Sequence, residues 1–301
     1  MGLLKPHKAT NVELEKLRFP VITLPKLDGV RGCFLNSKFT SRTLKEFRNR
    51  KLTYDFGRPE LQGFDGEIVV GNPLDQALCR RTTSFVNRFQ ENADISIEPT
   101  WYIFDWVTPE TVHMPYSDRL TLAKEYIKRL GKPNIKLVPE IAMCKSMDEL
   151  TNRYEEHIET GYEGIVIRSP QAYHKSGRST VSEGGFLRMK PEGTEEATIL
   201  DVIEAQANFN PKLANALGLT ERSSHKDNKI GKGMIGSLLV QLDDGRKIVI
   251  SAGCMTHEER TMYFQEQHKI RGRICTYRFM DYGEHNMRRH PRFVEFRDED
   301  L

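Results

Sequence analysis

Residues 25–31 read Pro25-Lys26-Leu27-Asp28-Gly29-Val30-Arg31, and they follow a β-branched run at residues 21–24. The run predicts a strand that enters a tight turn at Lys26. A lysine amine has a free pKa of about 10.4, but neighbouring cations or a metal ion can lower that value and release a nucleophile. Asp28 can orient the amine, Gly29 permits the turn, and Arg31 can hold a phosphate. Taken alone, the pattern also fits a solvated hairpin turn.

Composition is that of an ordinary soluble protein. The 301 residues suit about two domains, and 38% of them are hydrophobic and 29% charged. No apolar run approaches the roughly 20 residues that span a bilayer, and the N-terminus is too short and too polar for a secretory signal. Five scattered cysteines without a Cys-x-x-Cys pair argue against a disulfide framework or a zinc site. We therefore expect reduced thiols, a cytoplasmic location and no membrane partner.

Charge is unevenly distributed although the net charge is only +3. Residues 269–297 contain eight Lys or Arg against three acids, and a second basic run, residues 225–232, contains Lys226, Lys229 and Lys232. This asymmetry is typical of a protein that binds a phosphate backbone, although solvated surfaces would look the same.

The first two-thirds of the chain predicts mixed strands and helices. Ser117 is the expected N-cap of a helix that ends at Gly131, and Ser146 opens a capping box for a second helix that ends at Gly161. The expected strands are residues 21–24, 31–35, 64–70, 101–107 and 164–168. The sequence therefore predicts an α+β domain.

The pattern changes after Pro191, and residues 191–193 read as a linker. Short strands are expected at 198–205, 237–242, 247–251 and 272–279, with one helix at about 257–267. Several strands with a single helix favour a small β-barrel of the OB type. Residues 231–236 match Gly-x-Gly-x-x-Gly, but no strand immediately precedes them, so we interpret them as a flexible basic loop rather than a dinucleotide site.

Polar residues recur where a core strand would not favour them. Glu67 interrupts an apolar strand, and Glu163 precedes another. Arg188 and Lys190 alternate, so a strand would place both on one face. Together with the aromatic Phe104, they supply carboxylates for Mg²⁺, cations for phosphates and a ring for a base, which are the requirements of an activated nucleotide.

The order of these segments resembles the motifs of covalent nucleotidyltransferases, in particular the small ATP-dependent DNA ligases of viruses and phages. The resembling segments are residues 26–31, 41–42, 65–67, 102–105, 163–168, 187–191 and 288–298. The resemblance covers nearly the whole chain. It implies an α+β nucleotidyltransferase domain at residues 1–191 and an OB-fold domain at 192–301. It also implies that the cofactors are ATP and Mg²⁺ (or Mn²⁺) and that the partner is nicked double-stranded DNA. The implied protein is a monomer in a phage-infected or bacterial cytosol.

Roles follow from the resemblance position by position. Lys26 would attack the α-phosphate of ATP, Glu67 would bind ribose, and Phe104 would stack on adenine. Glu163 would hold the metal, and Arg188 and Lys190 would grip the AMP phosphate. Arg31 would contact the nucleotide and, with Arg42, the nick. Arg297 and Asp298 would orient pyrophosphate, and Lys226, Lys229 and Lys232 would lie on a mobile loop, residues 208–233, that DNA orders.

Three departures from the family pattern concern details. Arg188 stands where lysine is frequent, no lysine follows Asp298, and Leu24-Pro25 replaces a polar side chain near adenine. Base recognition is therefore expected to use backbone groups. An RNA-capping guanylyltransferase, an RNA ligase and a catalytically silent nucleic-acid-binding protein are the competing interpretations. An NAD⁺-dependent ligase would need a nicotinamide-binding module before Lys26.

Overall fold

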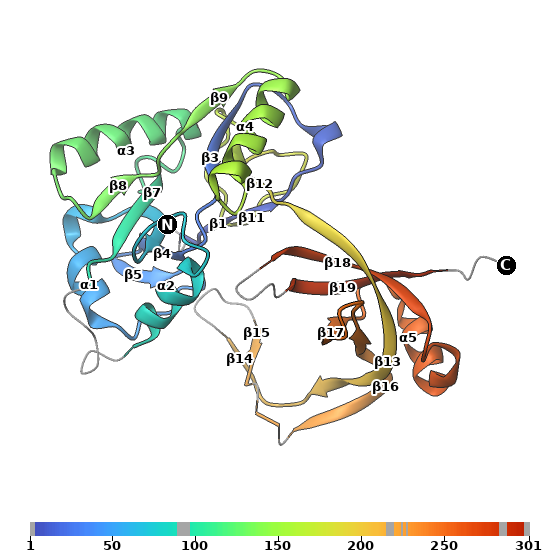
Figure 1. Cartoon of the computed structure of the whole chain (residues 1–301). Helices are drawn as coiled ribbons and strands as arrows, with labels where there is room; N and C mark the ends of the chain where they lie inside the picture. The colour runs from blue at the N-terminus through green and yellow to red at the C-terminus, as the bar shows by residue number, and fades with distance from the viewer. Residues whose placement is uncertain are drawn as a thin grey trace. The chain divides into compact units, whose positions relative to one another are not determined.

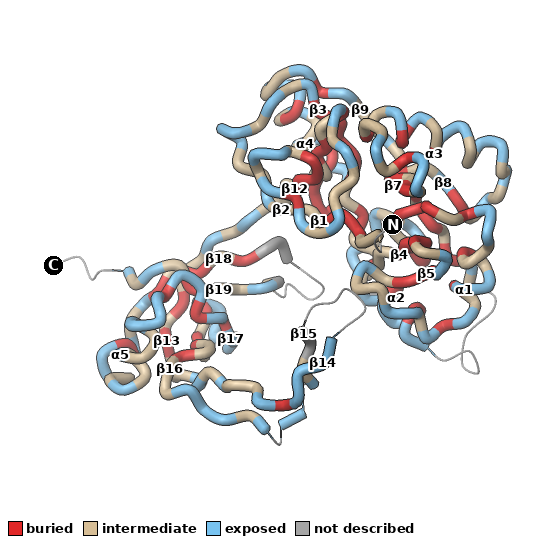
Figure 2. Tube along the Cα trace, turned by 180° about the vertical axis from the view of Figure 1, so that it is seen from behind, coloured by how far each residue is buried: buried red, intermediate tan, exposed pale blue. Residues whose placement is uncertain are grey.

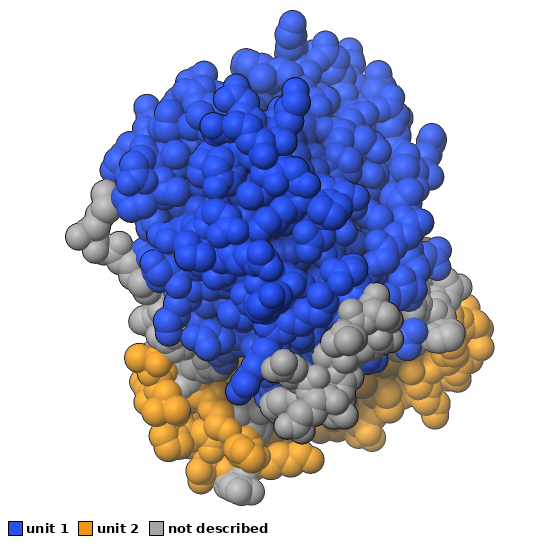
Figure 3. Space-filling model, turned by 90° about the vertical axis from the view of Figure 1, so that its left-hand side faces the viewer, with its two compact units in different colours: residues 1–190 blue, residues 191–301 orange. Residues whose placement is uncertain are grey.

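The structure, a computed structural model, describes residues 4–88, 97–214, 220–223, 225–226, 228–282 and 288–297. The chain divides into two compact units, residues 1–190 and 191–301, which are coloured separately in Figure 3. The first unit mixes helices and strands and the second is mostly β, so the predicted α+β class is confirmed.

Two five-stranded sheets form the framework of the first unit (Figure 1). One has the order β2-β12-β10-β3-β9, with bounds Thr10–Asn11, Leu187–Met189, Ile165–Arg168, Val21–Pro25 and Ala142–Cys144. The other has the order β5-β4-β6-β7-β8, with bounds Lys38–Ser41, Val30–Leu35, Phe64–Val69, Thr100–Trp106 and Ile135–Leu137. Because β3 belongs to one sheet and β4 to the other, the segment 26–29 crosses between them.

The helices of this unit are α1 (Arg50–Phe56), α2 (Leu78–Asn87), α3 (Tyr116–Leu130) and α4 (Met147–Thr160). Helix α3 packs on β7 and β8, and α4 packs on β9 (Figure 1). Short 3₁₀ turns lie at Leu14–Lys16 and Pro59–Leu61, and the two-residue strands β1 (His7–Lys8) and β11 (Gly177–Arg178) pair in parallel. The N-terminal segment thereby becomes part of the unit.

Capping explains where the two long helices begin and end. Ser146 accepts a hydrogen bond from the Glu149 amide at 3.2 Å, and Gly161 ends α4 with φ of 104°. Gly131 ends α3 as predicted, with φ of 62°. The prediction of Ser117 as N-cap is wrong, since α3 begins at Tyr116 with Pro115 as its N-cap residue, and the Ser117 hydroxyl donates to the Asp118 side chain at 3.1 Å.

Both sheets contain buried residues, as the red segments of Figure 2 show, and most of these residues are apolar. The largest cluster of this unit surrounds the fully buried Trp101, whose indole donates to the Gly32 carbonyl at 3.2 Å. A second cluster, around Leu24, Leu27 and Tyr116, lies beside the crossing segment. The core therefore fixes both strands that flank Lys26.

Five strands of the second unit close into a barrel, as predicted, in the order β13-β16-β17-β19-β18. Their bounds are Glu192–Asn208, Lys229–Gln241, Lys247–Ser251, Arg288–Phe296 and Ile274–Tyr282. The parallel contact between β17 and β19 consists of one residue pair, Ser251 with Arg292. Helix α5 (His257–Gln265) starts with a complete capping box at Thr256 and Glu259, and a 3₁₀ turn, Gln267–Lys269, follows it.

Strands β13 and β16 are much longer than predicted, because they continue pairing as far as Asn208 opposite Lys229. The hairpin of β14 (Lys212–Ala214) and β15 (Thr220–Arg222) follows. The interpretation of residues 231–236 as a loop is therefore wrong, and so is that of 208–233 as a loop throughout. Polar strand extensions lack the apolar alternation on which a sequence-based assignment depends.

Candidate active site

Lys26 and Glu163 are joined through both backbone and side chains. The Lys26 amide donates to the Gly164 carbonyl at 2.9 Å, and the Glu163 amide donates to the Lys26 carbonyl at 3.3 Å. These bonds extend the antiparallel pairing of β3 with β10, in which Pro25 lies opposite Ile165. The Lys26 ammonium forms an ion pair with Glu163. Lys26 therefore points to the carboxylate and not away into solvent.

Glu163 also binds a second cation. Its other carboxylate oxygen forms an ion pair with Lys190, and the Glu163 side chain is only 5% exposed. A buried carboxylate between two ammonium groups holds both at defined positions and neutralises part of their charge. Lys26 and Glu163 lie 137 positions apart in the sequence, so only the fold brings this Lys26–Glu163–Lys190 cluster together.

Glu67 faces the same cluster from the second sheet. It lies opposite Arg31 on β4 and opposite Tyr102 on β7. Burial raises the pKa of Glu67 to about 7, against the opposing influence of Lys26 and Arg31. A carboxyl group that titrates near neutrality next to a candidate nucleophile is typical of a functional site.

Gly29 permits the close approach of the crossing segment to β6. A Cβ atom at this position would lie 2.2 Å from the Ile68 carbonyl oxygen and 3.0 Å from the Glu67 side chain. Only glycine therefore lets the segment after Lys26 pass so near Glu67.

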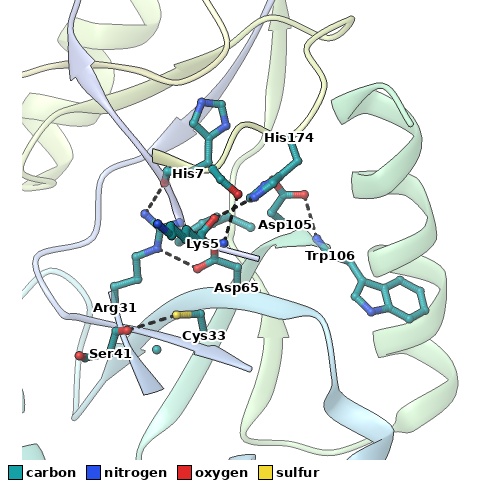
Figure 4. A network of polar contacts seen from close by, with 12 residues as sticks. Lys5, His7, Arg31, Cys33, Ser41, Asp65, Asp105, Trp106 and His174 are labelled. Carbon is teal, nitrogen blue, oxygen red and sulfur yellow. Dashed lines mark hydrogen bonds and ion pairs between the residues drawn. The ribbon is translucent and has the colours of Figure 1, made fainter. Parts of the chain in front are cut away.

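Arg31 is held by Asp65 rather than directed outward (Figure 4). Its Nε and Nη2 donate to the two Asp65 oxygens at 2.8 and 2.5 Å, and its Nη1 donates to the His7 carbonyl at 2.7 Å. The guanidinium carbon lies 5.1 Å from the centre of the Phe104 ring, and the Arg31 side chain is 11% exposed. Asp65 fixes this guanidinium. Asp65 precedes Glu67 by two residues, and this spacing is the sequence signal that could have indicated its role.

Phe104 and Tyr102 share one face of β7. Phe104 packs 6.1 Å from Phe186, measured between ring centres, and contacts Arg31. Tyr102 lies opposite Glu67, and burial raises its pKa. The sequence analysis chose Phe104 for base stacking, and the fold adds Tyr102 as an aromatic ring nearer to Glu67.

Asp105 follows Phe104 at an irregularity of the β6–β7 pairing, lies opposite Asp65, and belongs to a buried charge cluster. It accepts from Arg119 at 2.8 and 3.0 Å and from Arg168 at 3.0 Å. Burial alone would raise the pKa of Asp105, but the two guanidinium groups outweigh it and hold the pKa well below the usual value. Since Arg168 belongs to β10, this cluster joins the two sheets behind the site.

Arg188 and Arg42 occupy different surroundings. Arg188 lies opposite Val166, and its Nε donates to the Asn11 side chain at 2.8 Å. Arg42 is exposed just after β5. Burial lowers the pKa of Lys8, as do the nearby cations Arg42, Arg178 and Arg31. A basic cluster of Lys8, Arg42 and Arg178 therefore lies near the site, and Lys8 and Arg178 were not identified from the sequence.

The remaining predicted residues belong to the second unit. Arg297 forms an ion pair with Glu196 across the barrel strands, and its amide donates to the Ile274 carbonyl at 3.0 Å. Lys229 and Lys232 lie on β16, and Lys226 lies in the bend before it. Asp298 lies outside the described residues.

Oxygen donors for a divalent metal are few. Within the described ranges, no three His, Cys, Asp or Glu side chains gather closely enough for a metal cluster. Mg²⁺ is commonly bound by one or two carboxylates together with substrate phosphates, so Glu163, with Glu67 nearby, fits a metal that arrives with ATP. The donors do not form an all-protein metal cage.

Comparison with known proteins identifies the family to which the chain belongs. The family model for the ATP dependent DNA ligase domain matches residues 3–184. The chain belongs to the ATP-dependent DNA ligase family. The model for the DNA ligase OB-like domain matches residues 229–297, in the second unit.

Relatives of this ligase family differ in how much they share. The DNA ligase of Enterobacteria phage T3 is 26% identical over 165 residues, which are 54% of this chain and 40% of that protein. The chain thus matches less than half the length of this curated relative. The Chlorella virus DNA ligase-adenylate is 26% identical, with a TM-score of 0.54 and 100% of both chains covered. A Lig E DNA ligase shares the fold with a TM-score of 0.73 at 18% identity, over 97% of this chain and 99% of its own.

Within the described ranges of this ligase-family chain, no helix is long and apolar enough to cross a membrane.

Proposed function

We propose that this protein seals nicks in duplex DNA with ATP, through a lysyl-AMP intermediate and a DNA-adenylate. The observation that carries the proposal is the Lys26–Glu163–Lys190 cluster with Glu67 facing it. It combines one amine, the cations that phosphates require and a carboxyl group suited to ribose. Family membership supports ATP as the nucleotide.

The first step joins AMP to the protein. The deprotonated Nζ of Lys26 attacks the α-phosphorus of ATP, a P–N bond forms, the bond to the bridging oxygen breaks, and pyrophosphate leaves. Lys190 and Arg188 neutralise the phosphate oxygens, and Glu67 holds a ribose hydroxyl. When bound, Mg²⁺ (or Mn²⁺) held at Glu163 would offset phosphate charge and act as a Lewis acid. Arg297 orients the leaving pyrophosphate.

The next two steps use the nick. The 5′-phosphate attacks the lysyl-AMP phosphorus, the P–N bond breaks, and Lys26 recovers its amine. The 3′-hydroxyl then attacks the activated 5′-phosphate, forms the phosphodiester bond and expels AMP. Arg42, with Lys8 and Arg178 beside it, binds the 5′-phosphate. Asp65 fixes the guanidinium of Arg31, which contacts the nucleotide and the nick.

The second unit and the cellular setting complete the proposal. Lys229 and Lys232 contact the DNA backbone from the strand extension and Lys226 from the bend before it, and the protein acts as a monomer in a bacterial or phage-infected cytosol. The five cysteines all lie in the described ranges and form no disulfide there, which suits a reducing compartment. Residues 1–191 form the nucleotidyltransferase domain of this proposal and 192–301 the OB-fold domain.

A nicked duplex with a labelled 5′-phosphate tests the proposal directly. With ATP and Mg²⁺ we expect a full-length ligated strand, and no ligation when the nick carries a 5′-hydroxyl. Binding of the nicked duplex without any product, or a product that requires GTP in place of ATP, would contradict the proposal.

A further inference from the structure

The two residues before Lys26, Leu24 and Pro25, offer no polar side chain to a nucleotide base, and the hydroxyl of Thr23 is buried and donates to the Ala142 carbonyl. Leu24 is 2% exposed and belongs to the apolar cluster of Leu27 and Tyr162, against which Tyr102, Ile141 and Val166 pack. A purine bound beside Tyr102 would therefore meet aliphatic and aromatic groups, and β3 itself would offer only backbone atoms for recognition.

Glu140 reaches the same place from a neighbouring segment. Strand β9 pairs antiparallel with β3, with Ala142 opposite Thr23, so the residues just before β9 run beside the end of β3 that leads to Lys26. The Tyr162 hydroxyl donates to Glu140 Oε1 at 3.2 Å. Because Tyr162 directly precedes Glu163, this bond ties Glu140 to the segment that faces Lys26.

The second oxygen of Glu140 retains its capacity to accept a hydrogen bond. Oε2 lies 3.8 Å from Arg153 Nη2 and 3.6 Å from His157 Nε2, both longer than a hydrogen bond. His157 donates from Nδ1 to the Arg153 carbonyl at 2.8 Å, and burial lowers its pKa, so neutral Nε2 is also an acceptor. The Glu140 side chain is 42% exposed. Because the His157 side chain is fully buried, Glu140 Oε2 is the acceptor that a ligand can reach, and a carboxylate oxygen favours a ligand that supplies an amine.

The backbone of Glu140 adopts a conformation that residues with a Cβ rarely adopt. Its φ is 52°, and Arg153 Nη2 donates to its carbonyl at 2.6 Å, which holds the segment in this state. Unfavourable backbone conformations of this kind concentrate at functional sites. The conformation brings the carboxylate to Tyr162 at a cost that glycine would avoid.

We propose that Glu140 determines nucleotide specificity by accepting a hydrogen bond from the exocyclic amine of adenine, and that Tyr162 is a positioning residue for its carboxylate. The inference rests on the proposed function and deepens it. Guanine carries a carbonyl oxygen where adenine carries the amine, so the Glu140 carboxylate would repel it.

The test compares ATP with purine riboside triphosphate, which lacks the amine. The measured quantity is the second-order rate constant for adduct formation on Lys26, at nucleotide concentrations below saturation. The wild-type protein should prefer ATP by at least about tenfold, as expected for a hydrogen bond to a charged group. Glu140→Gly accepts the positive φ, and it should lower the ATP rate to that of the analogue while leaving the analogue rate unchanged.

Further variants distinguish a role in nucleotide recognition from a merely structural role. Tyr162→Phe should reduce the ATP preference without changing the analogue rate, and Glu140→Gln, which keeps a neutral acceptor, should retain part of the preference. Glu155→Gln, an exposed change on α4, should behave as wild type.

Equal loss with both nucleotides in Glu140→Gly and Tyr162→Phe would indicate a merely structural role and overturn the inference. An unchanged preference in Glu140→Gly would also overturn it, while the proposed function would stand. If the wild-type protein formed no adduct with any nucleotide, the proposed function would fail and the inference with it.

Discussion

Glu67 shows how a single residue can carry a functional role at the expense of stability. Burial raises its pKa to about 7 from an ordinary value of 4.5, so the folded state binds a proton more tightly than the unfolded state does. Stability therefore falls as pH rises from about 4.5 to about 7, and the penalty is complete above pH 7.

Replacement of this carboxyl should remove the penalty. We expect Glu67→Gln to stabilise the nucleotide-free protein at pH 8 by about 1–3 kcal/mol relative to wild type, and to change its stability little at pH 4.5. Thermal unfolding across this pH range measures the difference, with the exposed Glu159→Gln as the control. A difference between Glu67→Gln and wild type that did not grow with pH would refute the assignment of the raised pKa.

Asp65 supports the site in a different way, since it compensates a buried guanidinium. Asp65→Asn leaves Arg31 with a weaker, neutral partner, and we expect it to destabilise the protein by about 3 kcal/mol. The exposed pair of Arg246 with Asp244 is the matched control, because water already solvates both charges and Asp244→Asn should therefore destabilise the protein far less. Chemical denaturation of both variants provides the comparison, and equal effects would show that burial of the Arg31 pair has no energetic consequence.

At the scale of single elements, the segment between β3 and β4 depends on Gly29. Gly29→Ala would place a carbon 2.2 Å from the Ile68 carbonyl oxygen, so the segment must move away from β6 and Lys26 must move with it. We expect adduct formation to fall by about 100-fold or more while the circular dichroism spectrum is retained. Gly245→Asn, at a hairpin position with φ of 82° and open space around it, should leave the rate unchanged. Wild-type rates in Gly29→Ala would contradict the importance of this close approach.

Elements differ in how far the sequence predicts them. The β-branched residues 21–24, the capping box at Ser146 and the glycines at 131 and 161 act through neighbours in the chain, so β3, α4 and the ends of α3 and α4 could be predicted. The extension of β13 and β16 could not, because its register depends on a partner more than twenty residues away and the glycines at 231, 233 and 236 are unfavourable in a strand.

The same division applies to the site. Lys26, Glu67, Glu163 and Lys190 were named from the sequence because charged residues within or next to apolar strands have no role in a core. Asp65, Tyr102, Lys8 and Arg178 were missed, because their importance depends on which strands become neighbours. Glu140 gave no signal, since a lone glutamate before a short strand is indistinguishable from a surface residue.

At the scale of the whole molecule, DNA binding should involve the strand extension of the second unit. We expect replacement of Lys226, Lys229 and Lys232 by alanine to weaken binding of a nicked duplex and to lower the slope of log affinity against log salt by up to about 3. A triple alanine variant of Lys124, Lys128 and Lys136, in the first unit, is the control. Fluorescence anisotropy over a salt series measures both slopes. An unchanged slope in the first variant would exclude phosphate contacts by these lysines.

The central claim is that Lys26 carries AMP, and peptide mapping by mass spectrometry tests it most directly. After incubation with ATP and Mg²⁺, wild-type protein should carry one AMP, stable in alkali and labile in acid as a P–N bond is, on the peptide that contains Lys26, and added pyrophosphate should remove it. Lys26→Ala should carry none. An adduct on another residue, or wild-type protein that never acquires AMP, would contradict the account.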